Sequence, residues 1–303
     1  MMTLRTATLT IDRPSVRQRA MDYLALGKPR VVVMVLAVTV AGFYMGASQT
    51  PDWLRLLHVL IGVALSAGGT LALNQFMERH EDALMERTQG RPLPEGRIPP
   101  ASALMSGFVS VAVGLCYLMA AVNVLAAVVT ATTTITYLFW YTPLKRKSTF
   151  CSIVGAIPGA LPPVTGWVAA RGTLGQEAWI LFAMMFLWQL PHALAIALLY
   201  CEDYARAGFQ LLPVLHPDGH STGRQIVTNC LALFGVALLP TLIGMTGPIY
   251  FIAMCIIGLG FLAFGLETAL TRTKEAARRL VLASLVYLPL MFLVMAFDKV
   301  SVG

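Results

Sequence analysis

The chain has 303 residues, of which 57% are hydrophobic and only 12% are charged, and its mean hydropathy is +0.72. Soluble proteins carry roughly 25% charged residues, so this composition excludes a soluble globular protein and indicates an integral membrane protein. The net charge of +7 requires no nucleic-acid partner, because a basic inner face beside anionic lipid explains it. We expect a cytoplasmic N-terminal segment over residues 1–24 and a single transmembrane domain over residues 25–303.

The predicted elements are apolar runs near or above the length that crosses a bilayer as a helix. In chain order they cover residues 31–47, 54–76, 101–119, 121–142, 151–170, 178–199, 226–244, 248–270 and 279–297. No glycine, proline or charge separates Met119 from Val122, so length alone divides the third run from the fourth. The expected fold is all-α, a bundle of nine transmembrane helices.

The distribution of Lys and Arg tests this number of helices, because these residues concentrate in cytoplasmic loops. With a cytoplasmic N-terminus, 19 of the 22 lie in inside segments, and only Arg55, Arg171 and Lys299 lie outside. The pattern predicts an N-terminus inside, a C-terminus outside and an active site on the cytoplasmic face. Asp12 and Asp22 in the short N-terminus argue against a transit peptide, so a bacterial inner membrane is favoured over the mitochondrial inner membrane.

Asn74, Glu78 and Asp82 lie at the end of the second run and just beyond it, at positions i, i+4 and i+8. On a helix this spacing places three oxygen-bearing side chains on one face, about 6 Å apart along the axis. A solvated helix end would explain any one of the acids. Asn74 and Glu78, however, continue an apolar helix, where polar groups are costly and tend to be functional. Oxygen ligands suit Mg²⁺, which proteins commonly hold with one or two carboxylates plus substrate phosphates.

Cations that could bind a phosphate follow this motif. Arg87 and Arg91 come directly after it, and arginine is well suited to gripping phosphate. Lys145 and Arg146 lie at another cytoplasmic helix end. Such a cluster is most often a topology determinant, so a phosphate role for these two rests on context.

A second acidic group, Glu202 and Asp203 beside Tyr204, follows the sixth run. A solvated helix terminus would explain part of it. Two acidic helix ends on one membrane face can also hold metal ions around a diphosphate. His192, one residue after Pro191 in an apolar helix, is balanced between a packing role and a role as a metal ligand, since imidazole is a usual iron ligand.

Eight motifs in the same order resemble the UbiA superfamily of intramembrane prenyltransferases, and more narrowly its haem-farnesylating branch. They are Lys28-Pro29-Arg30, Asn74-x3-Glu78-x3-Asp82, Met85-x-Arg87-Thr88, Arg91-Pro92-Leu93-Pro94, Tyr141-Thr142-x-Leu144-Lys145-Arg146, Pro162-Pro163-x2-Gly166-Trp167, Trp188-Gln189-x-Pro191-His192, and Asp203-Tyr204-x2-Ala207-Gly208-x3-Leu212-Pro213. Glu78 and the Pro191-His192 pair separate this branch from the quinone-type members, which have aspartate at the position of Glu78. Where those members have a second Asp-x3-Asp motif, this chain has Tyr200 and Tyr204.

The resemblance implies an enzyme that transfers the farnesyl group of farnesyl diphosphate to a vinyl group of haem B within the lipid bilayer, with Mg²⁺ as cofactor. It implies catalytic roles for Asn74, Glu78, Asp82 and Asp203, and metal ligation by Asn74, Glu78, Asp82, Glu202 and Asp203. It implies substrate binding by Arg30, Arg87, Arg91, Lys145, Arg146, His192 and Tyr204. A downstream haem A synthase is a candidate partner.

Two other functions remain as alternatives. A sister prenyltransferase would use the same diphosphate chemistry on a quinone precursor or a chlorophyll-type acceptor. An anion transporter would also fit basic inner loops and helix-breaking prolines, but transporters usually show related halves and a polar site near the bilayer midplane. In this chain the acids gather at one face.

Overall fold

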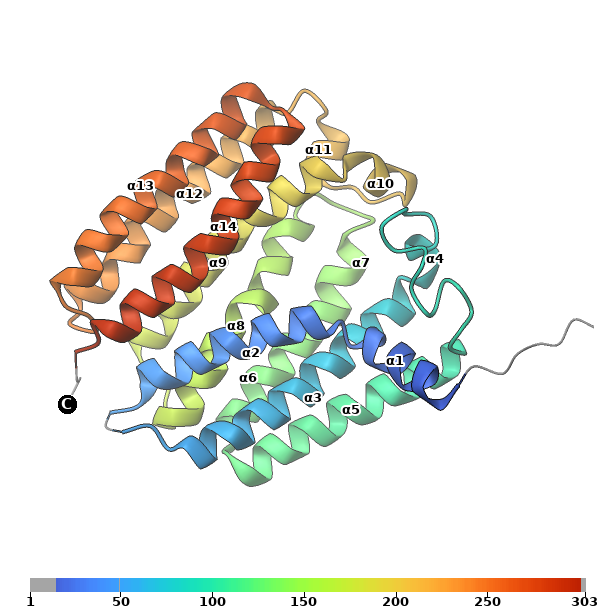
Figure 1. Cartoon of the computed structure of the whole chain (residues 1–303), viewed down its shortest axis with the longest axis horizontal. Coiled ribbons are helices and arrows are strands. Elements are labelled where there is room, and N and C mark those ends of the chain that lie inside the picture. Colours follow the sequence, from blue (N-terminus) through green and yellow to red (C-terminus); the bar gives the residue numbers. More distant parts are fainter. Residues whose placement is uncertain (1–14, 49, 301–303) are drawn as a thin grey trace, which may run out of the picture.

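The computed structural model describes residues 15–48 and 50–300, which form an all-α bundle (Figure 1). In that part of the chain nine helices are long and apolar enough to cross a membrane, which confirms the predicted number. They are α2 (Pro29–Gly46), α3 (Trp53–Met77), α5 (Pro100–Ala121), the composite span of α6 (Val124–Ile135), the π-helix η1 (Thr136–Tyr141) and α7 (Thr142–Leu144), α8 (Cys151–Arg171), α9 (Gln176–Leu199), α12 (His220–Leu242), α13 (Pro248–Thr271) and α14 (Lys274–Phe297). The short helices are α1 (Val16–Leu26), α4 (Arg79–Asp82), α10 (Cys201–Arg206) and α11 (Leu212–Leu215).

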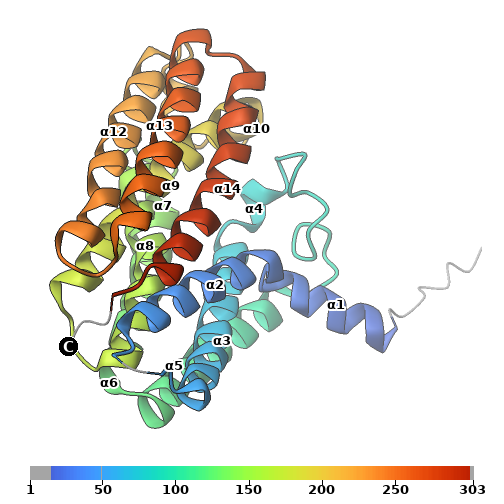
Figure 2. The ribbon, with the colours of Figure 1, turned by 60° about the vertical axis from the view of Figure 1, so that its left-hand side comes forward.

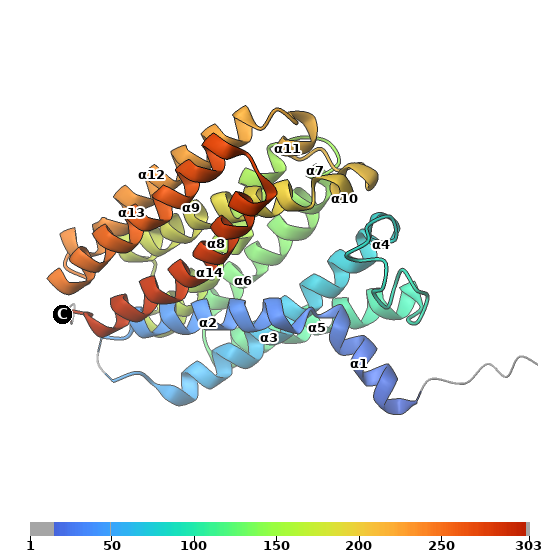
Figure 3. The same ribbon diagram turned by 45° about the horizontal axis from the view of Figure 1, so that its top comes forward.

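The helices form two groups that meet at α8. In the first group α3 packs against α5, and α2 packs against α8; in the second α12 packs against both α9 and α13, and α14 against α9 and α13. Figure 2 shows α12 and α13 on one flank of the bundle, with α2, α3 and α5 on the other. The short helices α4, α10 and α11 lie at the same end of the bundle (Figure 3), so the longest polar connections share that end.

Several helices begin earlier than the apolar runs predict. The seventh span begins at His220 rather than at residue 226, and the ninth begins at Lys274 rather than at residue 279. Hydropathy detects only the apolar part of a helix, whereas a cap fixes its true start: Thr273 accepts a hydrogen bond from the Ala276 amide at 3.1 Å. Helix α1 also crosses the predicted boundary between residues 24 and 25. Residues 1–14 of the expected N-terminal segment, and residues 301–303, lie outside the described residues.

Asn123 divides the third span from the fourth. Its Oδ1 accepts a hydrogen bond from the Ala126 amide at 2.7 Å and so caps α6, while its Nδ2 donates to the Val168 carbonyl of α8 at 3.0 Å. An asparagine before an apolar run is a typical helix start. The sequence therefore contained a signal for this boundary besides length.

Helices α2 and α8 approach each other at glycines. A Cβ atom on Gly42 would lie 1.9 Å from the Pro163 carbonyl oxygen, and a Cβ atom on Gly166 would lie 2.0 Å from the Thr39 carbonyl oxygen. Neither position therefore tolerates a side chain without a backbone shift. Small residues commonly allow such close contact between membrane helices.

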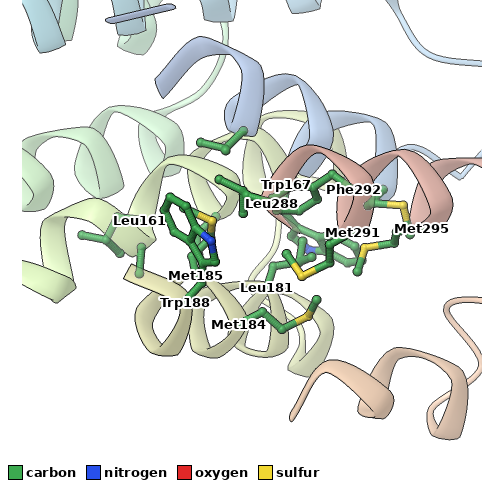
Figure 4. Close-up of a cluster of buried hydrophobic side chains, with 14 of the residues drawn as sticks. Leu161, Trp167, Leu181, Met184, Met185, Trp188, Leu288, Met291, Phe292 and Met295 are labelled. Atoms are coloured by element: carbon green, nitrogen blue, oxygen red, sulfur yellow. The ribbon is translucent and has the colours of Figure 1, made fainter. Parts of the chain in front are cut away.

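The largest apolar core cluster includes the junction of α8, α9 and α14 (Figure 4). Trp167 of α8, Met184 of α9 and Met291 of α14 are among its fully buried side chains. In a membrane these contacts act through dense packing, because lipid is as apolar as the core. This packing holds α9 firmly against α14. Helix α9 carries His192, and α14 carries Ser284, the hydrogen-bond partner of His192.

Candidate active site

Asn74, Glu78 and Asp82 form an oxygen trio at one end of the bundle, where α3 passes into α4. Helix α3 ends at Met77 and α4 begins at Arg79. The Glu78 amide nevertheless donates to the Asn74 carbonyl at 2.9 Å, and the Asp82 amide donates to the Glu78 carbonyl at 2.8 Å. Helical spacing thus continues through the interruption and keeps the three side chains on one face. Only 0%, 7% and 1% of these residues' surfaces, respectively, are exposed.

Both carboxylates of the oxygen trio are paired with a cation. Lys145 Nζ donates to Glu78 Oε1 at 2.8 Å, and Arg91 Nη1 lies 2.6 Å from Asp82 Oδ2. Burial opposes the charge of Lys145, but the neighbouring Tyr141 oxygen and the Glu78 carboxylate raise its pKa well above the usual range. Lysine and arginine have more N–H donors than these contacts use, so both can bind an anion at the same time.

The amide of Asn74 is fixed by two neighbours. Its Oδ1 accepts a hydrogen bond from Lys28 Nζ at 3.1 Å, and its Nδ2 donates to Thr142 Oγ1 at 3.1 Å. The Thr142 hydroxyl in turn donates to the Tyr137 carbonyl at 2.9 Å, within the π-helical turn before it. The hydroxyl proton is therefore committed, and Thr142 can only accept from Asn74. This arrangement turns the amide oxygen, a potential metal ligand, toward Lys28.

Lys28 is a site residue that the sequence pattern did not single out. Its motif suggested Arg30 instead, yet Arg30 is exposed on α2 and forms no ion pair with any residue in 15–48 or 50–300. Burial, together with the charges of Arg91 and Lys145, lowers the pKa of Lys28 to about 7. Its backbone is left-handed, with φ of 48°, a conformation that costs energy in a residue other than glycine and is often found at functional sites. A lone lysine directly before an apolar helix was the available signal.

The oxygen trio has the donor chemistry that a divalent metal ion needs. Carboxylate and amide oxygens are the ligands that Mg²⁺ accepts, and all three lie buried on one helical face. Throughout the described ranges, no three His, Cys, Asp or Glu side chains are gathered closely enough to hold a metal ion. A metal ion held by Glu78 and Asp82 would therefore depend on Asn74 and on oxygens of a bound phosphate.

The loop after α4 meets the segment after α9 at the same end. The Glu86 amide donates to Asp203 Oδ1 at 3.3 Å, and Arg87 Nη2 donates to the Tyr204 hydroxyl at 3.2 Å. The Arg87 guanidinium also lies over the Tyr200 ring, 5.1 Å from its centroid. The structure thus brings together three predicted site residues, Arg87, Asp203 and Tyr204, that are remote in the sequence.

A cavity of about 430 Å³ lies between these two segments, within the range typical of small-molecule sites. Arg206 links its two walls, because it forms ion pairs with Asp203 and, at 3.2 Å, with Glu86. The residues that line the cavity are Glu86, Arg87, Leu199, Tyr200, Glu202, Asp203, Arg206 and Lys274. The cavity is thus lined at this end by groups of both charges.

Two other predicted residues form ion pairs outside the oxygen trio. Glu202 pairs with Lys274 at 2.8 Å, and 79% of its side chain is exposed; the hydrogen bond and charge of Lys274 lower the pKa of Glu202. Arg146 pairs with Glu81, and 58% of its side chain is exposed. The structure does not gather Glu202 into a group of acids, so the first acidic motif is the better defined of the two.

His192 lies deeper in the bundle, on α9. Leu199, at the end of that helix, is seven positions further along the chain, which is about 10 Å along the axis. Its ring stacks on Trp188 with centroids 5.1 Å apart and planes 15° apart. Its Nδ1 lies 2.6 Å from Ser284 Oγ of α14. The ring is therefore held in one orientation below the polar end.

Comparison with known proteins identifies the family. Residues 35–295 match the model of the UbiA prenyltransferase family. The chain is 47% identical to the protoheme IX farnesyltransferase of Solibacter usitatus, across 92% of this chain and 98% of the relative. It is 40% identical to that of Koribacter versatilis, across 97% and 98%.

Solved structures share the fold. A digeranylgeranylglyceryl phosphate synthase superposes with a TM-score of 0.76 at 16% identity, covering 92% of this chain and 98% of the other. A UbiA homologue from Archaeoglobus fulgidus bound to DMAPP and Mg²⁺ superposes with a TM-score of 0.64 at 17% identity, covering 91% and 99%. The chain therefore belongs to the UbiA prenyltransferase family and, within that family of membrane enzymes, to the protoheme IX farnesyltransferases.

Proposed function

We propose that the chain converts haem B to haem O by transferring the farnesyl group of farnesyl diphosphate to a haem vinyl group, with Mg²⁺ bound at the oxygen trio. The observation that carries this proposal is the pairing of each buried trio member with a cation. These cations are Lys28, Lys145 and Arg91. Such a set of charges suits a metal–diphosphate complex, which brings both positive and negative charge to the site.

The trio and its cations would share the work of binding the diphosphate. Asn74, Glu78 and Asp82 would ligate the metal, and the three cations would donate hydrogen bonds to phosphate oxygens. Bound Mg²⁺ would stabilise the negative charge of the departing diphosphate. The Archaeoglobus fulgidus homologue was solved with Mg²⁺ and a prenyl diphosphate, which supports this choice of metal.

In the proposed reaction the bond between farnesyl C1 and oxygen breaks, and its electron pair leaves with the diphosphate. The cations stabilise that charge in place, without reorganising water. The haem vinyl π pair forms the new carbon–carbon bond to farnesyl C1. Water adds to the cationic vinyl carbon and loses a proton, which completes a hydroxyethylfarnesyl group. The apolar helices shield the allylic cation from earlier capture by water.

The second loop would complete the site. Arg87 of the loop after α4, which contacts Tyr204 and Tyr200 of the segment after α9, would bind the diphosphate. Asp203 would hold the two loops together through the Glu86 amide. Substrate or metal roles for Arg30, Arg146 and Glu202 rest on the family resemblance alone.

His192 would place the haem, as an axial ligand of its iron or through a propionate. Its depth below the polar end and its fixed ring support this role. The active site would face the cytoplasm across a bacterial inner membrane, because 19 of the 22 cations fall on that side of the topology. A haem A synthase as the next enzyme is supported by the resemblance only.

A two-acceptor assay tests the proposed function. The purified full chain in lipid nanodiscs receives farnesyl diphosphate and Mg²⁺ with either haem B or 4-hydroxybenzoate, and products are identified by mass. We expect a haem product that has gained one farnesyl group and one hydroxyl group. A prenylated benzoate alone would reassign the enzyme to quinone-type acceptors.

The metal site has its own test in the same assay. Chelation with EDTA should stop turnover and excess Mg²⁺ should restore it. Glu78→Gln and Asp82→Asn should each abolish turnover in folded protein, because each removes the negative charge of a proposed metal ligand. Glu95→Gln, at an exposed acid of the same loop, serves as the matched control and should keep full activity. Turnover close to wild type in both trio variants would reject the metal site.

A further inference from the structure

We propose that Ser284 is a positioning residue that fixes the tautomer of His192, so that an unprotonated Nε2 is presented to the haem. This inference rests on the proposed function for its purpose, but its structural content concerns the protein alone. Ser284 lies on α14, outside every motif that identified the site, and is fully buried.

The assignment follows from the number of protons available between three groups. Ser284 Oγ lies 2.6 Å from the Val281 carbonyl oxygen and 2.6 Å from His192 Nδ1. Both separations are hydrogen-bond distances. A carbonyl oxygen has no proton to donate, and a serine hydroxyl has only one. The serine proton therefore goes to Val281.

The contact between Ser284 and His192 must then be made with a proton from the ring. Nδ1 carries the hydrogen and donates it to Ser284 Oγ, which leaves the Nε2 lone pair free. Nε2 forms no hydrogen bond with any residue of the described ranges. It is also not one of the fully buried side-chain nitrogen and oxygen atoms that lack a hydrogen-bond partner. A neutral imidazole with one nitrogen anchored and the other free is the form in which histidine binds a metal.

Two further contacts hold this geometry. Trp188 Nε1 donates to the Ser284 carbonyl at 3.0 Å, so the indole is tied to the same residue that anchors the imidazole. The two rings are stacked within 15°. Rotation of His192 would therefore break both the stack and the Nδ1 hydrogen bond. Ser284 thus fixes the tautomer of His192 directly and, through Trp188, the orientation of the imidazole plane.

The direct experiment reads the tautomer in the haem-free full chain. Long-range ¹⁵N–¹H correlation spectra of protein labelled at histidine distinguish the two nitrogens, and His192→Gln assigns the signal. We expect protonation at Nδ1 in the wild type and a shift toward the Nε2-protonated form in Ser284→Ala. Protonation at Nε2 in the wild type would overturn the inference, whatever the enzyme's acceptor is.

Haem binding supplies a second readout. Ser284→Ala should weaken haem B binding roughly 10- to 100-fold, as loss of such a supporting hydrogen bond does elsewhere, and change the iron–histidine stretching band. Ser284→Thr retains the hydroxyl and should recover binding. Ser110→Ala, which removes a helix hydroxyl bonded to the Leu65 carbonyl, controls for loss of a serine at another helix contact.

His192→Ala distinguishes the ligand role of His192 from the positioning role of Ser284. If it leaves haem affinity and spectrum unchanged, the proposed ligand role fails while the tautomer result stands by itself. His192→Ala could instead remove the iron–histidine stretching band. If Ser284→Ala is then folded by circular dichroism but changes neither the His192 tautomer nor the haem affinity, the positioning role of Ser284 is wrong.

Discussion

Lys145 and Lys147 are two residues apart, but only one of them contacts the oxygen trio. Lys145 binds Glu78, whereas Lys147 is exposed. Lys145→Met leaves a buried carboxylate without its partner, which costs about 3–5 kcal/mol in comparable sites. We expect kcat/KM for farnesyl diphosphate to fall at least about 100-fold, equivalent to about 2.7 kcal/mol. Steady-state kinetics at saturating haem B measure this loss.

Lys147→Met is the matched control, because it removes the same charge from the same membrane face. It should retain nearly all activity. If both variants lose activity equally, the general positive charge of this helix end matters and the specific pair does not.

Thr142 should tune metal affinity without being a metal ligand. Thr142→Val removes the acceptor for Asn74 Nδ2 and frees the amide to turn its oxygen away. We expect the Mg²⁺ concentration for half-maximal rate to rise roughly tenfold, as when other supporting partners of metal ligands are lost. Thr130→Val, at another buried threonine that donates only to its own helix, should leave the Mg²⁺ titration unchanged. Equal Mg²⁺ titrations for the two variants would mean that Thr142 does not orient Asn74.

Residue spacing predicted the oxygen trio but not its partners. Asn74, Glu78 and Asp82 are close in sequence, and helical geometry alone puts them on one face. The contact of Lys28 with Asn74 spans 46 residues, and that of Lys145 with Glu78 spans 67. Such pairs depend on how whole helices pack. Local patterns therefore could not reveal that Lys28 contacts Asn74, nor show that Glu202 turns to Lys274.

At the level of helices, hydropathy located every span but not every end. The membrane selects for apolar length, so the nine runs could be read directly. Helix ends depend on capping groups and polar turns, which a hydropathy profile does not distinguish from other polar segments. The π-helical turn Thr136–Tyr141 gave no signal at all, yet the Tyr137 carbonyl within it binds the Thr142 hydroxyl.

The contact between α2 and α8 should be sensitive to a single methyl group. Gly166→Ala would place a Cβ atom 2.0 Å from the backbone oxygen of Thr39, so one helix must move. We expect a loss of about 1–3 kcal/mol of stability, the usual cost of overpacking. The midpoint of thermal unfolding in detergent, followed by circular dichroism, should fall by several degrees, as expected from the usual conversion.

Gly235→Ala is the control for this helix contact. Gly235 lies within α12, and a Cβ atom there meets nothing within 4 Å. Alanine favours helix over glycine by about 1 kcal/mol, so the midpoint should stay the same or rise. A Gly166→Ala midpoint equal to that of the wild type would show that α2 and α8 can separate at no cost.

On the scale of the whole molecule, the fold places all the proposed diphosphate chemistry at one end. The short helices α4 and α10 lie at that end (Figure 1), and the trio and the cavity lie beside them. The loop between α8 and α9, with the exposed Thr173, lies at the opposite end. From the charge pattern we propose that the active-site end faces the cytoplasm, where a charged diphosphate would reach the site without crossing the membrane.

Labelling of intact bacterial cells tests this orientation. Asp218 is exposed in the connection between α11 and α12, at the active-site end, and Thr173 is exposed at the other. A membrane-impermeant maleimide should react with Thr173→Cys in intact cells but with Asp218→Cys only after the membrane is opened. The unsubstituted chain, which has five native cysteines, sets the background. Because an odd number of spans puts these two loops on fixed opposite sides, the reverse labelling would invert the whole molecule. It would place the diphosphate site outside the cell, where the positive-inside rule does not allow this charge pattern.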